Sequence, residues 1–187
     1  MHTMVLCGLE TGQPLSKHIT RTVRKCIPEQ EETAWFDLPS MNINYCNGCG
    51  YCGDVKPGLC AKKDDMQQIY PHLARASRIV FISPIRFGGY GGHMKKAIDR
   101  FSPMGLGTYR LYKGELHHHA RYGATTSVLS IGILPQPDAA QEQTFLLASS
   151  RIAACLFGDT AATTVVNGGM DQAAIGETIT DIFKRQG

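Results

Sequence analysis

Short apolar runs alternate with longer segments of helical periodicity along this 187-residue chain. The clearest run is RIVFIS at 78–83, which predicts a buried central strand. The glycine-rich segment after it leads into a helix with apolar residues at core spacing, namely Met94, Ala97, Ile98 and Phe101. Strict alternation of strands and helices is typical of a parallel sheet with crossover helices. The chain is therefore predicted to have an α/β fold.

This alternation predicts five strands and five helices. The strands are expected at 4–7, at Trp35 and Phe36, at 78–83, at 125–133 and at 163–166. One helix is expected to follow the glycine-rich turn, and the others to begin at Pro14 and near Asp64 or to cover 140–156 and 170–184. The pattern favours a flavodoxin-like three-layer sandwich, with a five-stranded parallel sheet of order 2-1-3-4-5.

Two segments carry further expectations. Pro71 should kink or split the second helix, because proline lacks a backbone N–H. Residues 102–122 are expected to form a long, irregular connection of the kind that is often functional or at a subunit contact. The chain contains no repeat or linker, so residues 1–187 are expected to form a single domain.

Composition excludes several classes of protein. The chain is 43% hydrophobic without a long apolar run, so no transmembrane helix is expected. Its N-terminus lacks the pattern of a secretory signal. A net charge of +3 is too small and too scattered to favour a nucleic-acid partner. We therefore expect a cytoplasmic protein, in which clustered cysteines suggest metal or redox chemistry rather than disulfides.

Four of the seven cysteines form a compact array: Cys46, Cys49 and Cys52 recur every third residue, and Cys60 follows a seven-residue loop. One short segment with this spacing can wrap several thiolates around one centre, as in many iron–sulfur proteins. A zinc ion would also accept four thiolates, and free thiols are a third possibility. Metal or redox chemistry is the first hypothesis for this cysteine loop, residues 46–60.

The predicted topology brings this loop near a possible cofactor site. Ligands of such sheets bind beyond the carboxyl ends of the strands, where the strand order reverses. The turns after the first and third strands meet there, and the cysteine loop follows the second strand on the same edge.

Three motifs resemble a known family: CNGCGYC at 46–52, GLCAKKDD at 58–65 and SPIRFGGYGGHMKKAIDR at 83–100. Together they resemble the NADPH-dependent FMN reductase superfamily, and within it the iron–sulfur flavoproteins. The resemblance implies an FMN site, a 4Fe–4S cluster on the four cysteines, and electron transfer between the two. It also implies a homodimer or homotetramer, with a ferredoxin-type protein or NAD(P)H as electron donor.

The resemblance assigns the FMN phosphate to the turn after the first strand, with Thr11, Gln13 and Ser16 as candidate donors near a helix start. This turn departs from the family pattern, since Leu9 replaces the usual serine and no arginine is present. Glu10 adds a negative charge where a phosphate is expected, which is unfavourable unless it points outward.

The turn after the third strand is expected to run along the isoalloxazine ring, since its glycines allow close backbone approach. Arg86 replaces the family's usual tyrosine and could stabilise negative charge on the reduced ring. Gly132 is assigned by topology to the third cofactor-facing turn. The other candidate residues of this ring site are Pro84, Ile85, Phe87, Gly88 and Gly89.

Two other groups of polar residues are expected to serve the structure or its surface. Asp99 and Arg100 are expected in structural or interface roles. Residues 117–119, three consecutive histidines, are expected to be solvated or at an interface.

The sequence thus favours an FMN-dependent oxidoreductase or electron-transfer flavoprotein with a cluster. Two alternatives remain: a cluster-free NAD(P)H-dependent FMN or quinone reductase, and a binding module that has lost FMN and carries zinc or free thiols.

Overall fold

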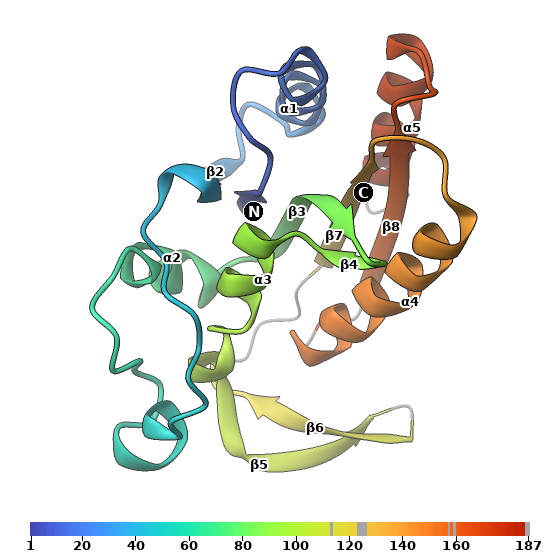
Figure 1. Ribbon diagram of the computed structural model, residues 1–187. Helices are drawn as coiled ribbons and strands as arrows, with labels where there is room; N and C mark the ends of the chain where they lie inside the picture. Colours follow the sequence, from blue (N-terminus) through green and yellow to red (C-terminus); the bar gives the residue numbers. More distant parts are fainter. Residues whose placement is uncertain (113, 123–126, 157, 159, 186–187) are drawn as a thin grey trace.

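The computed structural model describes residues 1–112, 114–122, 127–156, 158 and 160–185. Its main sheet has five parallel strands in the order β2-β1-β3-β7-β8, which confirms the predicted sheet order (Figure 1). A sixth strand, β4, was not predicted and pairs antiparallel with the end of β3. The strands are β1 (His2–Cys7), β2 (Glu32–Asp37), β3 (Arg78–Arg86), β4 (Gly89–Tyr90), β7 (Ser127–Leu134) and β8 (Thr160–Asn167).

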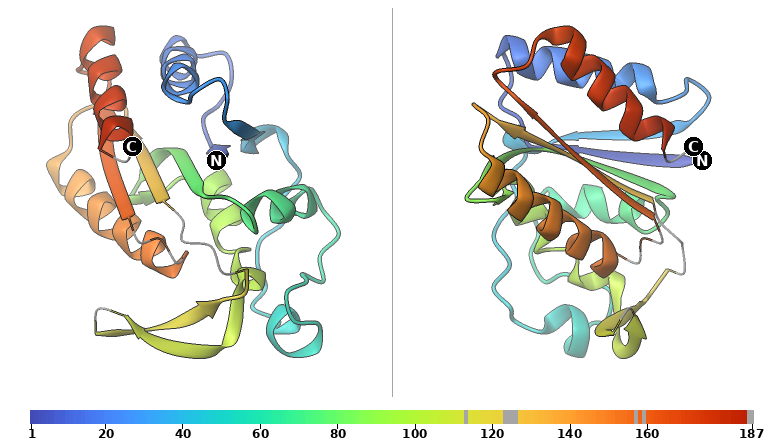
Figure 2. Two further views of the ribbon diagram at one scale, coloured as in Figure 1. Left: turned by 180° about the vertical axis from the view of Figure 1, so that it is seen from behind. Right: turned by 90° about the vertical axis from the view of Figure 1, so that its right-hand side faces the viewer.

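Helices cover both faces of this sheet, as expected for three layers (Figure 2). On one face lie α1 (Pro14–Cys26) and α5 (Gln172–Lys184), and on the other α2 (Met66–Leu73), α3 (Gly92–Ile98) and α4 (Ala139–Cys155). Within the described ranges, no helix has both the length and the apolar character needed to cross a membrane.

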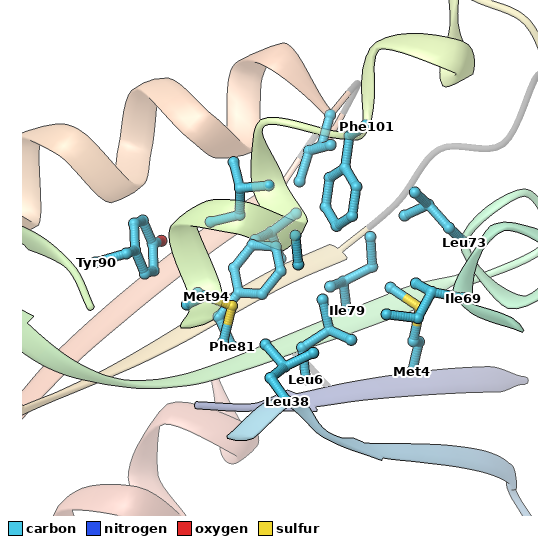
Figure 3. Packing of buried hydrophobic residues seen from close by; sticks show 14 of the residues in the cluster. Met4, Leu6, Leu38, Ile69, Leu73, Ile79, Phe81, Tyr90, Met94 and Phe101 are labelled. Atoms are coloured by element: carbon cyan, nitrogen blue, oxygen red, sulfur yellow. The ribbon is translucent and has the colours of Figure 1, made fainter. Parts of the chain in front are cut away.

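The core follows the two-residue periodicity of β3. Ile79 and Phe81 pack with α2, α3 and α4 in one buried cluster (Figure 3), whereas Val80 and Ile82 pack with α1 and α5 in the other. A strand buried on both faces explains the continuous apolar run at 78–83. Burying each such side chain contributes about 1.5–3 kcal/mol.

Several predicted boundaries shift. β3 continues past 83 to Arg86, because its end pairs with β4. Pro71 does not split a long helix, since α2 ends two residues later at Leu73. The fourth strand was expected from 125, but residues 125 and 126 lie outside the described residues, and β7 is described from Ser127.

The prediction of an irregular connection at 102–122 is wrong. After a short 3-10 helix, η3 (Ser102–Met104), the chain forms an antiparallel pair of strands, β5 (Gly105–Tyr112) and β6 (Glu115–Ala120). This hairpin forms a sheet of its own beside the main domain (Figure 1). Most of its side chains are exposed or half-buried, so no apolar alternation marks it in the sequence.

Candidate functional site

The turn after β1 lies at the carboxyl edge of the sheet. The Gly8 N–H donates to the Ile82 carbonyl over 2.8 Å, which ties the start of the turn to β3. α1 follows with Pro14 in its first turn, and the Gln13 side chain makes no capping hydrogen bond. The N-cap side chain therefore leaves the N–H groups at the helix start uncapped, and such a position suits an anion.

The predicted phosphate residues only partly come together here. Thr11 and Ser16 line a pocket of about 310 Å³ between this turn, α1 and β2, which Gln13 does not line. Glu10 does not simply point away: its Oε1 lies 3.5 Å from His93 Nε2 on α3. Glu10 also lines this pocket, so its carboxylate lies in the region predicted for the phosphate.

Sequence reasoning missed the far wall of this pocket. Trp35 and Asp37, at the end of β2, line it together with Arg24. The Arg24 guanidinium lies 3.8 Å from the Trp35 ring centroid, a cation–π contact. The only sequence signal was the aromatic pair in the second strand.

The turn between β3 and β4 is held against α4. Phe87 (φ 51°) and Gly88 (φ 73°) both adopt left-handed backbone conformations. A Cβ on Gly88 would lie 2.5 Å from Thr144, so only glycine fits there. The Gly88 N–H also donates to Gln141 Oε1 over 3.4 Å. This turn is thus fixed by its backbone and by α4.

The side chains of this turn differ in exposure. Phe87 is 99% exposed, and Arg86 is exposed with its guanidinium donating to the Ile85 carbonyl over 3.1 Å. Ile85 itself is buried, so only its backbone could face a ligand. Tyr90 belongs to the core, where its hydroxyl lies 2.8 Å from Ser130 Oγ and burial raises its pKa to about 12.

Gly132 does not lie in a turn, which corrects its predicted placement. It sits inside β7 opposite Ser83, and the connecting turn begins only after Leu134. A Cβ on Gly132 would meet Phe145 at 2.6 Å and Ile85 at 2.7 Å. Its lack of a side chain therefore serves the packing of α4 onto the sheet.

The cysteine loop curls on left-handed glycines. Gly50 (φ 71°) precedes a π-helical turn, η2 (Tyr51–Val55), and Gly58 (φ 83°) follows it. The backbone around the thiols closes within the segment, since the Gly58 N–H donates to the Cys52 carbonyl over 3.0 Å.

All four cysteines of the loop line one pocket of about 400 Å³. Burial raises the pKa of the Cys52 thiol, and the other three cysteines of the loop raise it further. The β5–β6 hairpin supplies the facing wall, and the other lining side chains include Arg100, Tyr109 and His118.

The pocket does not present a ready single-ion site. Among the described residues, no three histidine, cysteine or carboxylate side chains are placed to hold one metal ion. A cubane cluster spaces its thiolates more widely than one tetrahedral ion does, and thiolate donors suit soft iron–sulfur centres. The donor set of four cysteines on one pocket therefore fits a cluster.

Arg100 is the functional candidate that sequence reasoning underrated. Its side chain is 1% exposed and forms a bidentate pair with Asp64, over 2.8 and 3.0 Å. It also donates to the Asn44 carbonyl over 2.9 Å and lines the cysteine pocket. The acidic pair after Cys60 and the DR at 99–100 were the available signals, but no spacing rule joins them.

Of the three histidines along β6, His118 and His119 are exposed, as expected, whereas His117 is not. His117 is buried, with Nε2 3.5 Å from Glu115. His118 Nδ1 lies 2.6 Å from the Leu106 carbonyl and His119 Nδ1 lies 3.0 Å from Thr108 Oγ1. The strand thus sends neighbouring rings to different faces.

A parallel sheet between two helical layers, with open turns at its carboxyl edge, defines a flavodoxin-like protein. A model of the NADPH-dependent FMN reductase family matches residues 1–154. The chain belongs to this family, whose name describes flavin-dependent oxidoreductases, and the resemblance seen in its motifs is confirmed.

Similar curated proteins are iron–sulfur flavoproteins. One from Methanocaldococcus jannaschii is 33% identical over 108 residues, covering 56% of this chain and 55% of that protein. One from Archaeoglobus fulgidus is 32% identical over 85 residues, covering 46% and 43%. The matches span between 30% and 55% of the length of these curated relatives.

Solved structures support the fold over the whole chain. An NAD(P)H:quinone oxidoreductase from Methanothermobacter marburgensis has a TM-score of 0.70 at 11% identity, covering 100% of this chain and 96% of that one. Smu.1420 from Streptococcus mutans UA159 also has a TM-score of 0.70, at 14% identity, covering 99% and 98%. At such identities the likeness concerns the fold alone.

Proposed function

We propose that this protein is an FMN-dependent oxidoreductase that binds FMN at the carboxyl edge of its sheet. Family membership supports the cofactor, and the uncapped start of α1 and the fixed β3–β4 turn support the location. Bound FMN would accept and pass on one or two electrons. The residues proposed around it are Thr11, Gln13, Ser16, Pro84, Ile85, Arg86, Phe87, Gly88 and Gly89, with Gly132 behind them in β7.

In this site the chain supplies position and charge. The backbone N–H groups at the start of α1 would face the phosphate, with the hydroxyls of Thr11 and Ser16 beside them. The β3–β4 turn would approach the ring closely, because Gly88 carries no side chain. Arg86 would place a positive charge near the ring and favour its reduced, negatively charged form.

The cysteine loop is proposed to hold a 4Fe–4S cluster on Cys46, Cys49, Cys52 and Cys60. The single observation that carries this proposal is that all four line one pocket. The cluster would supply one-electron transfer from a donor such as a ferredoxin-type protein. The names of similar proteins add support, since they are iron–sulfur flavoproteins.

Anaerobic purification with iron, sulfide and flavin analysis tests this function. The chain should contain one FMN and about four iron and four sulfide per chain. Cys49→Ser should lose iron, whereas Cys155→Ser, which changes an exposed cysteine outside the pocket, should keep it. Protein without iron after anaerobic reconstitution would refute the cluster.

A cluster-free NAD(P)H-dependent reductase is the second candidate. The observation that favours it is the family match itself, since the family is named for NADPH-dependent reduction of FMN. It predicts FMN without iron, and oxidation of NAD(P)H by a quinone in the purified protein. A folded chain that refuses FMN in a titration would instead favour a binding module.

A further inference from the structure

We infer that Arg100 is a positioning residue that closes the base of the cysteine loop and holds a fixed positive charge against the cysteine pocket. Its effect on a cluster rests on the function proposed above. Its effect on the loop does not, and this separates the two in experiment.

The base of the loop is a neck formed by residues 42–44 on one side and 64–65 on the other. The Asn42 N–H donates to Asp65 Oδ2 over 2.7 Å, and the Asp65 N–H donates back to the Asn42 carbonyl over 3.1 Å. The Asn44 N–H and its side-chain amide both donate to Asp64 Oδ2 over 3.0 Å. The two limbs of the neck are thus joined directly by hydrogen bonds.

Arg100 is the only residue from outside the neck that the described hydrogen bonds connect to both limbs. One of its terminal nitrogens donates to the Asn44 carbonyl, before the cysteines, and also to Asp64, after them. Asn44 lies two residues before Cys46, and Asp64 four residues after Cys60. One guanidinium therefore fixes where the cysteine segment starts and ends.

The backbone of Arg100 is fixed as well. The Tyr70 hydroxyl, on α2, donates to the Arg100 carbonyl over 3.0 Å. Arg100 follows α3, so this bond joins α2, which begins directly after the neck, to the segment after α3. The guanidinium is thus held from both its own main chain and its carboxylate partner.

The charge of this pair is directed at the pocket. Arg100 lines the cysteine pocket, whereas its partner Asp64 does not. The Arg100 Nε–H is buried and has no hydrogen-bond acceptor among the described residues. A buried cation with an unused donor thus belongs to the same pocket wall as the four cysteines, and charge-assisted hydrogen bonds suit anionic acceptors such as thiolates.

This placement has a consequence for electron uptake. Reduction adds one electron to a cluster that four thiolates already make negative. A fixed positive charge beside it stabilises the reduced form and raises the reduction potential. Removing Arg100 should therefore make the cluster harder to reduce.

The test uses the double variant Arg100→Met with Asp64→Asn, which removes the guanidinium charge and its partner carboxylate together, so that no buried charge is left unpaired. Arg100→Lys is the conservative variant. The matched control is Arg78→Met with Glu31→Gln. That pair is also buried, with side chains 7% and 12% exposed, and Arg78 likewise has a buried Nε without an acceptor among the described residues. It lies at the start of β3, at the amino edge of the sheet.

The first measurement is hydrogen–deuterium exchange of the iron-free proteins. We expect exchange at 46–60 to become about tenfold faster in the Arg100/Asp64 variant, because a loosened neck opens more often. The Arg78/Glu31 control should not change this segment, and Arg100→Lys should be intermediate. Unchanged exchange at 46–60 in the Arg100/Asp64 variant would overturn the inference.

The second measurement is the midpoint potential of the reconstituted proteins. We expect the Arg100/Asp64 variant to shift its one-electron reduction constant about tenfold toward the oxidised form, or about 59 mV lower. A shift as large in the control, or none in the variant, would overturn the electrostatic role. A parent chain that never takes up iron would refute the proposed cluster, while the exchange result would still decide the role of Arg100 at the neck.

Discussion

Asp64 and Arg100 form a buried ion pair that is joined to several neighbouring groups by hydrogen bonds. Both are 1% exposed, and removing two charges from water is costly unless every hydrogen-bonding position is used. Asp64 accepts from Arg100, from the Asn44 main chain and side chain, and from the Met66 N–H. Burial would raise the pKa of Asp64, but these hydrogen bonds, with Arg100 first, lower it well below its usual range.

Asp64→Ala should lower the free energy of unfolding by about 3–5 kcal/mol, because it leaves a buried guanidinium without its partner. Urea denaturation followed by circular dichroism measures this. Asp181→Ala is the control, since Asp181 pairs with Lys184 in an exposed ion pair that is worth at most about 1 kcal/mol. Equal losses in the two variants would contradict the reading of Asp64 as a buried, fully bonded carboxylate.

Asp64 also predicts a pH dependence. Its folded-state pKa is lowered, so the ionised form stabilises the fold. This stability is fully present above the usual carboxyl value of about 4 and is lost as the pH falls through the folded-state pKa. Stability measured from pH 6 down to pH 2 should fall less steeply in Asp64→Asn than in the parent chain. If the free energy of unfolding fell equally steeply with pH in both proteins, other carboxylates would be responsible for the loss of stability in acid.

Glu10 tests the position of the phosphate. Glu10→Arg replaces a repulsive charge by an attractive one, worth about 1–2 kcal/mol at an exposed site, so FMN should bind about tenfold more tightly. Fluorescence titration of the apoprotein measures the Kd. Glu177→Arg makes the same change of charge on the exposed face of α5 and should leave the Kd unchanged. No response at Glu10 would remove the turn after β1 from the phosphate site.

At the scale of elements, α4 both covers the sheet and holds the β3–β4 turn. Asp138 caps α4 by accepting from the Gln141 N–H over 3.0 Å and from its side chain over 2.8 Å. Gln141 in turn accepts from the Gly88 N–H. The cap of a helix is thus linked by one side chain to the turn proposed to contact the flavin.

Asp138→Ala should therefore lower both the Tm and the affinity for FMN. Asp171→Ala is the matched control, because Asp171 caps α5 through the Ala174 N–H over 2.8 Å but has no link to the turn. Both variants should lose some thermal stability, since each loses a cap, yet only Asp138→Ala should raise the Kd for FMN. Equal Kd values in the two variants would show that the cap of α4 does not affect FMN binding through the β3–β4 turn.

The main sheet could be predicted from the sequence because its signals are local. The run at 78–83 is apolar throughout, and the glycine-rich turns mark where strands end. The β5–β6 hairpin could not be predicted, because its strands pair with each other rather than with the buried sheet. The same holds for the candidate site. The cysteines could be predicted from their spacing, whereas Arg100 could not, because it is 36 residues from Asp64 in sequence and the two meet only in the tertiary fold.

At the scale of the whole molecule, the two buried clusters lie on opposite faces of the main sheet, and the cysteine loop supplies no residue to either. Ile43 and Met66, which lie on either side of the loop in sequence, belong to the cluster that packs with α2, α3 and α4. The stability of the domain therefore depends on the sheet and its helices rather than on the thiols.

Removing iron with a chelator should accordingly leave the domain folded. Far-UV circular dichroism should be retained, while exchange at 46–60 should increase, since only local order depends on the metal centre. Loss of the whole spectrum on chelation would instead show that the centre is required for folding, as in zinc fingers.

The neck also makes the segment between its two limbs interchangeable. Asn42 and Asp65 are joined by two hydrogen bonds, one to the Asp65 carboxylate and one to the Asn42 carbonyl. Because these bonds hold the two ends of the segment together, the position of the ends does not depend on the residues between them. Segments of other lengths and chemistries could be grafted there without rebuilding the scaffold. A flavodoxin-like frame of this kind could gain or lose a redox module by a single local exchange.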